Sequence, residues 1–263
     1  MRIVVCLKQI LDPEVPAKDF RVDPTTKRPI QGNAKLVVDS YSENALEVGI
    51  QLKEKSGGKL VAVCVGDKRA DEVLRRALAL TADEAIRAWD PAWQELDAAA
   101  VAHVLARAIR ATGGADVVLL GRQSGDVERG LVGPMLAEEL GAPCVTVATG
   151  AEPAGDRLRV RREAEGGYEA VEVPLPAVLT VTNDEANVPR LPKVKDVMMA
   201  TRKPVKVLGT GDLQLDPSRM DPGVVLTDLY VPEMDSTCEF VEGDDGPAKA
   251  TALATLLRER KIL

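Results

Sequence analysis

The chain has 263 residues, and its 34 Lys and Arg against 41 Asp and Glu give a formal net charge of −7, which fits one large domain with or without an appendage. The negative charge argues against a general nucleic-acid-binding protein, because such a protein needs a basic face to displace counterions from phosphates. The sequence contains no run of 18 apolar residues and no signal-peptide pattern, so we expect no transmembrane segment and a cytoplasmic location.

Two hydrophobic patterns alternate through the first 150 residues. Short β-branched runs typical of buried strands occupy residues 3–7, 59–65, 85–89, 117–120 and 144–148. Segments with helical periodicity lie between them, at residues 43–55, 70–80, 97–112 and 130–140. This alternation predicts an α/β fold of the Rossmann-like kind, with a mostly parallel sheet and helices on both faces.

The pattern changes after residue 150. Short strands are expected at residues 157–162, 168–173 and 177–181, and the first two are joined by Glu165-Gly166-Gly167 as in a β-hairpin. Residues 187–206 contain six basic residues and one acid, so this segment carries +5 and the rest of the chain carries −7 − 5 = −12. We expect an extended arm with scattered strands over residues 207–246, followed by an amphipathic helix over residues 247–260.

Side chains for hydrolytic catalysis are scarce. The only histidine, His103, lies in the helical segment 97–112 among alanines that could not orient it, and the common nucleophile, zinc-protease and phosphate-loop motifs are absent. The four cysteines are widely spaced, so we expect reduced thiols packed as small apolar residues and no metal site. These features disfavour a dehydrogenase or hydrolase that works through its own side chains.

The best candidate for a ligand site lies between residues 117 and 140. An apolar strand there runs into a polar, glycine-containing loop, and a helix begins near Gly130 or Val132. Ligands of parallel sheets bind beyond the carboxyl ends of strands, where the N-terminus of the next helix offers free N–H groups to a phosphate. The glycines of the loop permit close approach, and its polar side chains could bond a ribose or phosphate: Gly121, Gly125, Gly130 and Gly133, with Gln123, Ser124, Asp126 and Arg129. On these residues alone, glycines that serve turn geometry only are an equally good interpretation.

Three other segments could complete the pocket. Residues 6–8 follow the first strand and residues 65–67 follow the second, so both are expected at the same edge of the sheet. Residues 39–42 resemble an N-cap loop for the helix that starts at Glu43.

A family resemblance is carried by residues 160–180. This segment is similar, position by position, to the signature of the electron transfer flavoprotein β subunit: Val160, Arg162, Glu165-Gly166-Gly167, Glu169, Val171, Pro176 and Val178-Leu179-Thr180. The resemblance extends over nearly the whole chain. It implies the smaller subunit of a heterodimer whose α subunit carries FAD, with an α/β nucleotide-binding domain over residues 1–186, a partner-recognition loop over residues 187–206, and a C-terminal arm and helix over residues 207–263 that dock on the α subunit.

The resemblance also implies an adenine nucleotide in the β subunit. The cofactor-binding residues carried over are Cys6, Asp39, Ser40, Tyr41, Ser42, Val65, Gly66, Gly121, Arg122, Gln123, Ser124, Gly125, Asp126, Val127, Glu128, Arg129, Gly130, Leu131, Val132 and Gly133. Tyr41 could also approach the flavin of the partner, or serve packing alone. Respiratory members hold structural AMP at this site, whereas electron-bifurcating members hold a second flavin that accepts hydride from NADH.

The branch of the family is indicated by the ends of the loop. Gly121-Arg122-Gln123 and Val132-Gly133-Pro134 resemble the bifurcating type, although Asp126-Val127-Glu128-Arg129 departs from its usual Asp-Gly-Asp-Thr. We expect FAD in this site, with AMP as the alternative. An electron carrier of this kind takes its chemistry from the cofactor, and a stand-alone nucleotide-binding sensor domain is the other alternative.

The basic segment 187–206 matches the family's recognition loop for partner dehydrogenases. Its residues would supply apolar anchors and steering charges: Leu191, Val194, Val197, Met198 and Met199, with Arg190, Lys193, Lys195, Arg202 and Lys203. The partners implied are the α subunit, acyl-CoA or other dehydrogenases, and a quinone or ferredoxin-type acceptor. A solvated basic loop without a partner is the alternative.

Overall fold

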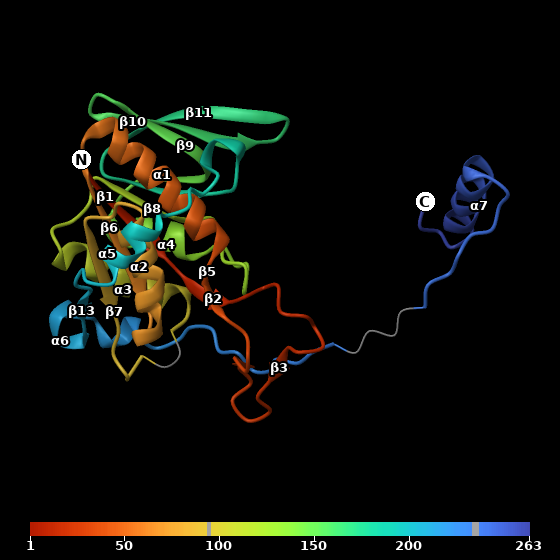
Figure 1. Cartoon of the computed structure of the whole chain (residues 1–263), viewed down its shortest axis with the longest axis horizontal. Coiled ribbons are helices and arrows are strands. Elements are labelled where there is room, and N and C mark those ends of the chain that lie inside the picture. Colours follow the sequence, from red (N-terminus) through yellow and green to blue (C-terminus); the bar gives the residue numbers. More distant parts are fainter. Residues whose placement is uncertain (94–95, 233–236) are drawn as a thin grey trace. The chain divides into compact units, whose positions relative to one another are not determined.

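The buried β-branched runs form the centre of a nine-stranded sheet in this computed structural model, which describes residues 1–93, 96–232 and 237–263 (Figure 1). The strand order is β11-β10-β9-β12-β8-β1-β6-β7-β13, and every pairing from β9 to β13 is parallel. The strands are β1 (Arg2–Leu7), β6 (Lys59–Val65), β7 (Glu84–Ala88), β8 (Val117–Gly121), β9 (Cys144–Ala154), β10 (Arg157–Ala164), β11 (Gly167–Pro174), β12 (Ala177–Val181) and β13 (Lys206–Leu208). The predicted mostly parallel α/β fold is confirmed.

Helices cover both faces of the parallel part. The longer ones are α1 (Ser40–Ser56), α2 (Asp71–Ala79), α3 (Ala98–Ala111) and α4 (Val132–Leu140). Side chains of β1 alternate between two cores: Ile3 and Val5 pack with α1 and α2, whereas Val4 and Cys6 pack with α3 and α4. Figure 1 shows α1 lying across β1, β8 and β9. This layered arrangement brings the carboxyl ends of β1, β6 and β8 to one edge.

The strands β9, β10 and β11 pair antiparallel in chain order, as the hairpin pattern predicts. β10 pairs antiparallel with both β9 and β11, and the turn at Gly166 has a positive φ of 80°. β9 extends to Ala154, well beyond the predicted end at residue 148. The antiparallel strands therefore widen the same sheet and do not form a separate one.

Several elements are not predicted by the sequence patterns. Residues 9–38 form two small two-stranded sheets, β2 (Gln9–Leu11) with β5 (Leu36–Val38) and β3 (Arg21–Val22) with β4 (Pro29–Ile30). Five short helical elements were also not expected: η1 (Lys68–Ala70), η2 (Glu185–Asn187), α5 (Val194–Ala200), α6 (Thr210–Leu213) and η3 (Pro217–Arg219). The expectation of a loop throughout residues 187–206 is wrong, because α5 lies within it. The expectation of an arm from residue 207 is wrong at its start, because β13 pairs with β7.

The chain forms two compact units, Met1–Asp228 and Leu229–Leu263. The smaller unit contains α7 (Gly246–Glu259), which confirms the predicted terminal helix; the Asp245 carboxylate accepts a hydrogen bond from the Ala248 N–H and caps it. Residues 233–236 of the predicted arm lie outside the described part. The docking of residues 207–263 on an α subunit stays a prediction.

Candidate nucleotide-binding site

The loop between β8 and α4 stands open at the carboxyl edge of the sheet. Seven consecutive residues, 125–131, are exposed, although the strand before them is buried as far as Leu120. Glu128 has a left-handed φ of 52°, and its N–H donates to the Ser124 carbonyl at 2.9 Å. The helix begins at Val132, and the Leu131 side chain provides no capping acceptor. The N–H groups of the first turn of α4 are therefore available to an anionic ligand.

Two glycines bring the backbone of this loop against its neighbours. A Cβ atom at Gly133 would lie 2.3 Å from Thr180 Cγ2, and one at Gly121 would lie 2.7 Å from Tyr41 Cβ. Both distances are too short for any side chain. The start of α4 can lie against β12, and the end of β8 against the start of α1, only because these two positions lack a side chain.

Asp39 ties the start of α1 to the same loop. Its carboxylate is fully buried, with Oδ2 accepting from the Ser42 N–H at 3.0 Å and Oδ1 accepting from the Gly125 N–H at 2.8 Å. The N-cap expected within residues 39–42 is confirmed at Asp39, but the expected start of the helix at Glu43 is wrong, because the helix begins at Ser40. One buried side chain thus fixes the position of two segments of the site.

Lys8 links the end of β1 to the β8–α4 loop. Its ammonium donates to Ser124 Oγ at 3.0 Å and to Asp126 Oδ1 at 2.6 Å. Burial would raise the pKa of Asp126, but the hydrogen bonds from Lys8 and Ser124 outweigh it and lower the pKa below 3.8. The sequence places Lys8 at the end of a strand, but its pairing with a residue 118 positions away has no local sequence signal.

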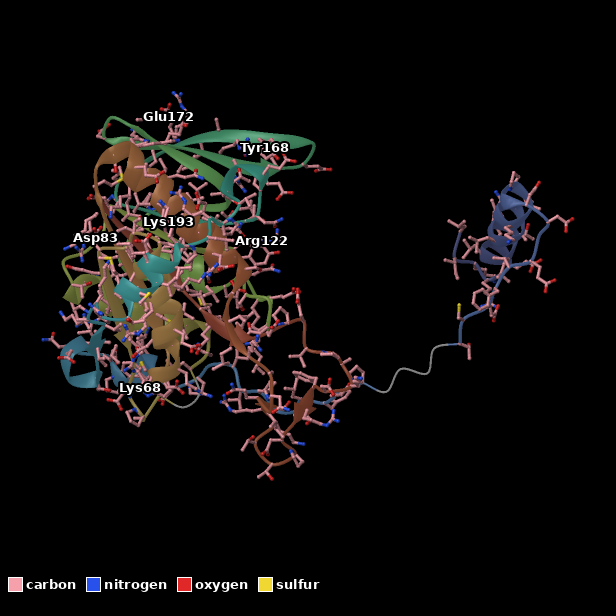
Figure 2. All side chains as sticks on the ribbon, viewed as in Figure 1. Lys68, Asp83, Arg122, Tyr168, Glu172 and Lys193 are labelled. Atoms are coloured by element: carbon pink, nitrogen blue, oxygen red, sulfur yellow. The ribbon has the colours of Figure 1, made fainter. Side chains whose placement is uncertain are left out.

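Arg122 is the half-buried cation of this loop, whereas Arg129 is exposed. Its guanidinium lies over the Tyr41 ring, 5.1 Å from the centroid, while its buried Nε has no hydrogen-bond partner. Figure 2 shows Arg122 beside the start of α1. A buried donor without an acceptor is costly. A ligand oxygen that approaches the guanidinium would give it a charge-assisted partner.

The structure brings most of the predicted site residues together and leaves a few at the margin. Gln123 and Ser124 are half-buried in the loop, and Val127, Arg129, Gly130 and Leu131 are exposed on it. Val65 and Gly66 end β6 at the same edge, next to η1. Burial, and then the neighbouring Cys64, raise the pKa of the Cys6 thiol to about 12, so Cys6 contributes shape and no reactive thiolate.

Comparison with known proteins decides the family. The electron transfer flavoprotein domain family matches residues 30–212. The chain is 39% identical over 221 residues to the electron transfer flavoprotein subunit β of Thermoanaerobacterium thermosaccharolyticum, covering 84% of this chain and 83% of that protein. The chain belongs to the electron transfer flavoprotein β-subunit family.

Two further relatives match over their whole length. The electron transfer flavoprotein subunit β of Bacillus subtilis is 32% identical over 266 residues, and subunit CarD of the caffeyl-CoA reductase-Etf complex of Acetobacterium woodii is 31% identical over 267 residues. Each match covers 100% of both chains. The function class is therefore electron transfer, as the resemblance of residues 160–180 implied.

The segment that resembles the recognition loop of electron transfer flavoproteins carries an exposed apolar helix. Leu191, Val194 and Met198 are exposed by 81%, 78% and 65%, and Val197 and Met199 are also exposed. Lys193 and Lys195 are exposed beside them, and Lys193 can be located in Figure 2. Arg190, expected to steer partners, instead pairs with Glu47 and Glu54 of α1. The exposed lysines remain the cations suited to steering.

His103 is more constrained than its sequence neighbours suggested. It is buried, its Nδ1 lies 3.0 Å from Glu139 Oε2 of α4, and the Asp216 N–H lies 3.3 Å from its Nε2. The expectation that nothing orients this ring is wrong, because its partners come from other elements. Its position on α3, away from the β8–α4 loop, is consistent with the predicted structural role.

The four cysteines differ in their exposure to solvent. Cys6 and Cys64 are buried and Cys144 is half-buried, but Cys238 is exposed, so the expectation of packed thiols is wrong for Cys238. Among the described residues, no cluster of three or more His, Cys, Asp or Glu could hold a metal ion. Within the same ranges, no helix has the length and apolar content to cross a membrane.

Proposed function

We propose that this β subunit pairs with an electron transfer flavoprotein α subunit and holds FAD in the site between β1, the start of α1 and the β8–α4 loop. The observation that carries this proposal is the guanidinium of Arg122, held over the Tyr41 ring where the backbone of β8 approaches the start of α1. It stands beside a loop whose N–H groups and exposed glycines suit a diphosphate. When bound there, FAD would accept hydride from NADH and deliver the electrons onward one at a time.

Each residue of the site would have a limited task. Arg122 would donate to an oxygen of the cofactor, and the first-turn N–H groups of α4 would face its phosphates. Asp39 and Lys8 would hold the loop in place through Gly125 and Asp126. Tyr41 would support the guanidinium of Arg122 by a cation–π contact.

Glu128 is compatible with a diphosphate in this loop. An acid there would repel phosphate if it pointed inward, but Glu128 is exposed and its left-handed backbone belongs to the outer part of the loop. The name of the relative from Acetobacterium woodii associates it with a reductase complex. Together with the Gly121-Arg122-Gln123 and Val132-Gly133-Pro134 ends, this supports the bifurcating branch.

AMP is the alternative ligand, and it is favoured by the departure of residues 126–129 from the usual loop of the bifurcating type. AMP would need only the adenosine and one phosphate, and would give the β subunit a structural role. A stand-alone sensor domain is the remaining alternative, and it predicts a monomer. Co-expression with the α subunit followed by size-exclusion chromatography distinguishes it, since we expect a heterodimer.

On the partner side, we propose that α5 and the exposed lysines before and within it receive acyl-CoA or other dehydrogenases. The acceptor would be a quinone or a ferredoxin-type protein. Exposed Leu191, Val194 and Met198 fit an apolar contact, and Lys193 and Lys195 fit an acidic rim.

A further inference from the structure

The helix α5 is not held in place by an apolar face. It has seven residues, and Ala200 is the only one that is buried. Val194, Met198 and Met199 are exposed by 78%, 65% and 53%. A helix this short is unstable by itself in water, and here its apolar side chains do not contribute core packing. Other contacts must fix its position.

The chain before α5 is clamped to α1 by an ion pair between a buried carboxylate, Glu47, and a guanidinium that is 39% exposed, Arg190. Arg190 donates from Nε to Glu47 Oε2 at 2.9 Å and from Nη2 to Glu47 Oε1 at 2.8 Å, and its backbone N–H lies 3.3 Å from Oε2. The Glu47 side chain is only 5% exposed. Burial would raise the pKa of Glu47, but the hydrogen bonds from Arg190 and Gln51 outweigh it and lower the pKa. Without Arg190 the Glu47 carboxylate would be buried and uncompensated, and without Glu47 the segment would be held to α1 only by the exposed pair of Arg190 with Glu54.

The same stripe of α1 holds the residues just before Arg190. Asn187 is fully buried; its amide donates to the Thr149 and Thr182 carbonyls at 2.9 Å and accepts from Asn44 at 3.0 Å. Gln51 donates to the Ala186 carbonyl at 2.9 Å. Asn44, Glu47 and Gln51 are spaced by three and four positions, so they share one face of α1. The polar side chains on that face therefore hold residues 186–190 against α1.

The other end of α5 is clamped to α2. Arg75 donates from Nη1 to the Ala200 carbonyl at 3.0 Å and to the Thr201 carbonyl at 2.7 Å. The Lys203 ammonium in turn donates to the Leu78 carbonyl, at the C-terminal end of α2, at 3.2 Å. These charge-assisted bonds go to carbonyl groups at the C-terminal ends of α5 and α2. Figure 1 shows α2 and α5 side by side.

We infer that Glu47 and Arg75 are positioning residues that hold α5 in its docking geometry before any partner binds, so that its apolar side chains stay free for that partner. The inference rests on the proposed role of α5 as the partner-recognition element. Holding the helix by polar clamps at its two ends lowers the ordering cost that binding would otherwise incur. It also explains why Arg190 is paired with α1 while Lys193 and Lys195 are exposed.

Limited trypsin digestion of the purified αβ heterodimer tests the inference without any partner. In Glu47→Gln, cleavage after Lys193 should be faster by about tenfold or more, because local release of the segment exposes that bond. In Arg75→Gln, cleavage after Arg202 should rise similarly. Glu54→Gln is the matched control: Glu54 pairs with the same Arg190 at 2.6 Å but is 57% exposed, so cleavage should stay within about twofold.

Two outcomes would overturn the inference. One is unchanged cleavage after Lys193 in Glu47→Gln together with unchanged cleavage after Arg202 in Arg75→Gln. The other is equal acceleration after Lys55, at the end of α1, which would indicate general loosening of that helix. The nucleotide released by acid from the same samples should match the parent protein. A heterodimer that lacks a second flavin but shows the expected cleavage pattern would contradict the cofactor proposal and leave the clamps intact.

Discussion

Lys8 and Asp126 form an ion pair, with 2.6 Å between Nζ and Oδ1, that joins the end of β1 to the β8–α4 loop. The side chains are 43% and 36% exposed, so the pair borders the candidate site and is not part of the core. A pair at this depth adds about 1 kcal/mol or less to the stability of the fold. Its main effect is to fix the position of the loop.

The first prediction concerns acid. The pKa of Asp126 is lowered in the folded protein, so the pair stabilises above the unfolded pKa near 3.8, and that stability is lost as the pH falls through the lower folded value. Asp126→Asn should therefore have a slightly lower thermal midpoint than the parent at pH 7 and a smaller difference from the parent at about pH 3. Thermal melts at the two pH values measure this. An equal difference at both pH values would contradict the assigned role of the charge.

The second prediction concerns Gly133. An alanine in the first turn of a helix is usually favourable, but here its Cβ would meet Thr180 Cγ2 at 2.3 Å. Gly133→Ala should destabilise the protein by about 1–3 kcal/mol and lower its nucleotide content, because the start of α4 must move. Gly150→Ala is the control, since no atom lies within 4 Å of the added Cβ. Denaturant unfolding and acid release measure the two effects, and parent-like values for Gly133→Ala would show that the phosphate site lies elsewhere.

The third prediction concerns Arg122. Arg122→Met keeps the apolar stem of the side chain but removes the donors proposed to face the cofactor. The affinity for the nucleotide should fall by about tenfold or more, with little change in thermal midpoint of the ligand-free protein. Arg159→Met, which breaks an exposed ion pair with Glu172, should leave nucleotide content unchanged. Retention of the nucleotide through dialysis measures the difference, and full retention by Arg122→Met would remove Arg122 from the site.

The fourth prediction concerns partner steering. Charge reversal at Lys193 and Lys195 should slow electron exchange with an acyl-CoA dehydrogenase, and the loss should shrink as salt rises because exposed charges are screened. Reversal at Lys18, which is also exposed, provides the control. Stopped-flow rates at low and high ionic strength test this. A loss that is independent of salt would indicate a structural effect in place of steering.

The sequence patterns predict the fold well where burial is strong and local. β1, β6 and β8 are short apolar runs buried on both faces, so composition alone identifies them. The loop between Gly121 and Gly133 was also predicted as the ligand site, because its glycines follow a buried strand. The structure is consistent with that placement, which stays a prediction about binding.

Features that depend on distant residues were not predicted. α5 has no buried apolar stripe, so its seven residues look like a loop. The internal role of Arg190 depends on Glu47, which lies 143 positions earlier in the chain. The orientation of His103 likewise depends on Glu139 and Asp216, from other elements. Long-range polar pairing has no periodic signal and is visible only in the folded chain.

The most direct test of the cofactor proposal is acid release of the ligands from the purified αβ heterodimer, followed by chromatographic quantification of FAD and AMP. We expect about two FAD per heterodimer, one of them lost in Arg122→Met, and no stoichiometric AMP. One FAD with one AMP per heterodimer would contradict the assignment of a flavin to the site formed by Lys8, Asp39, Tyr41 and Arg122.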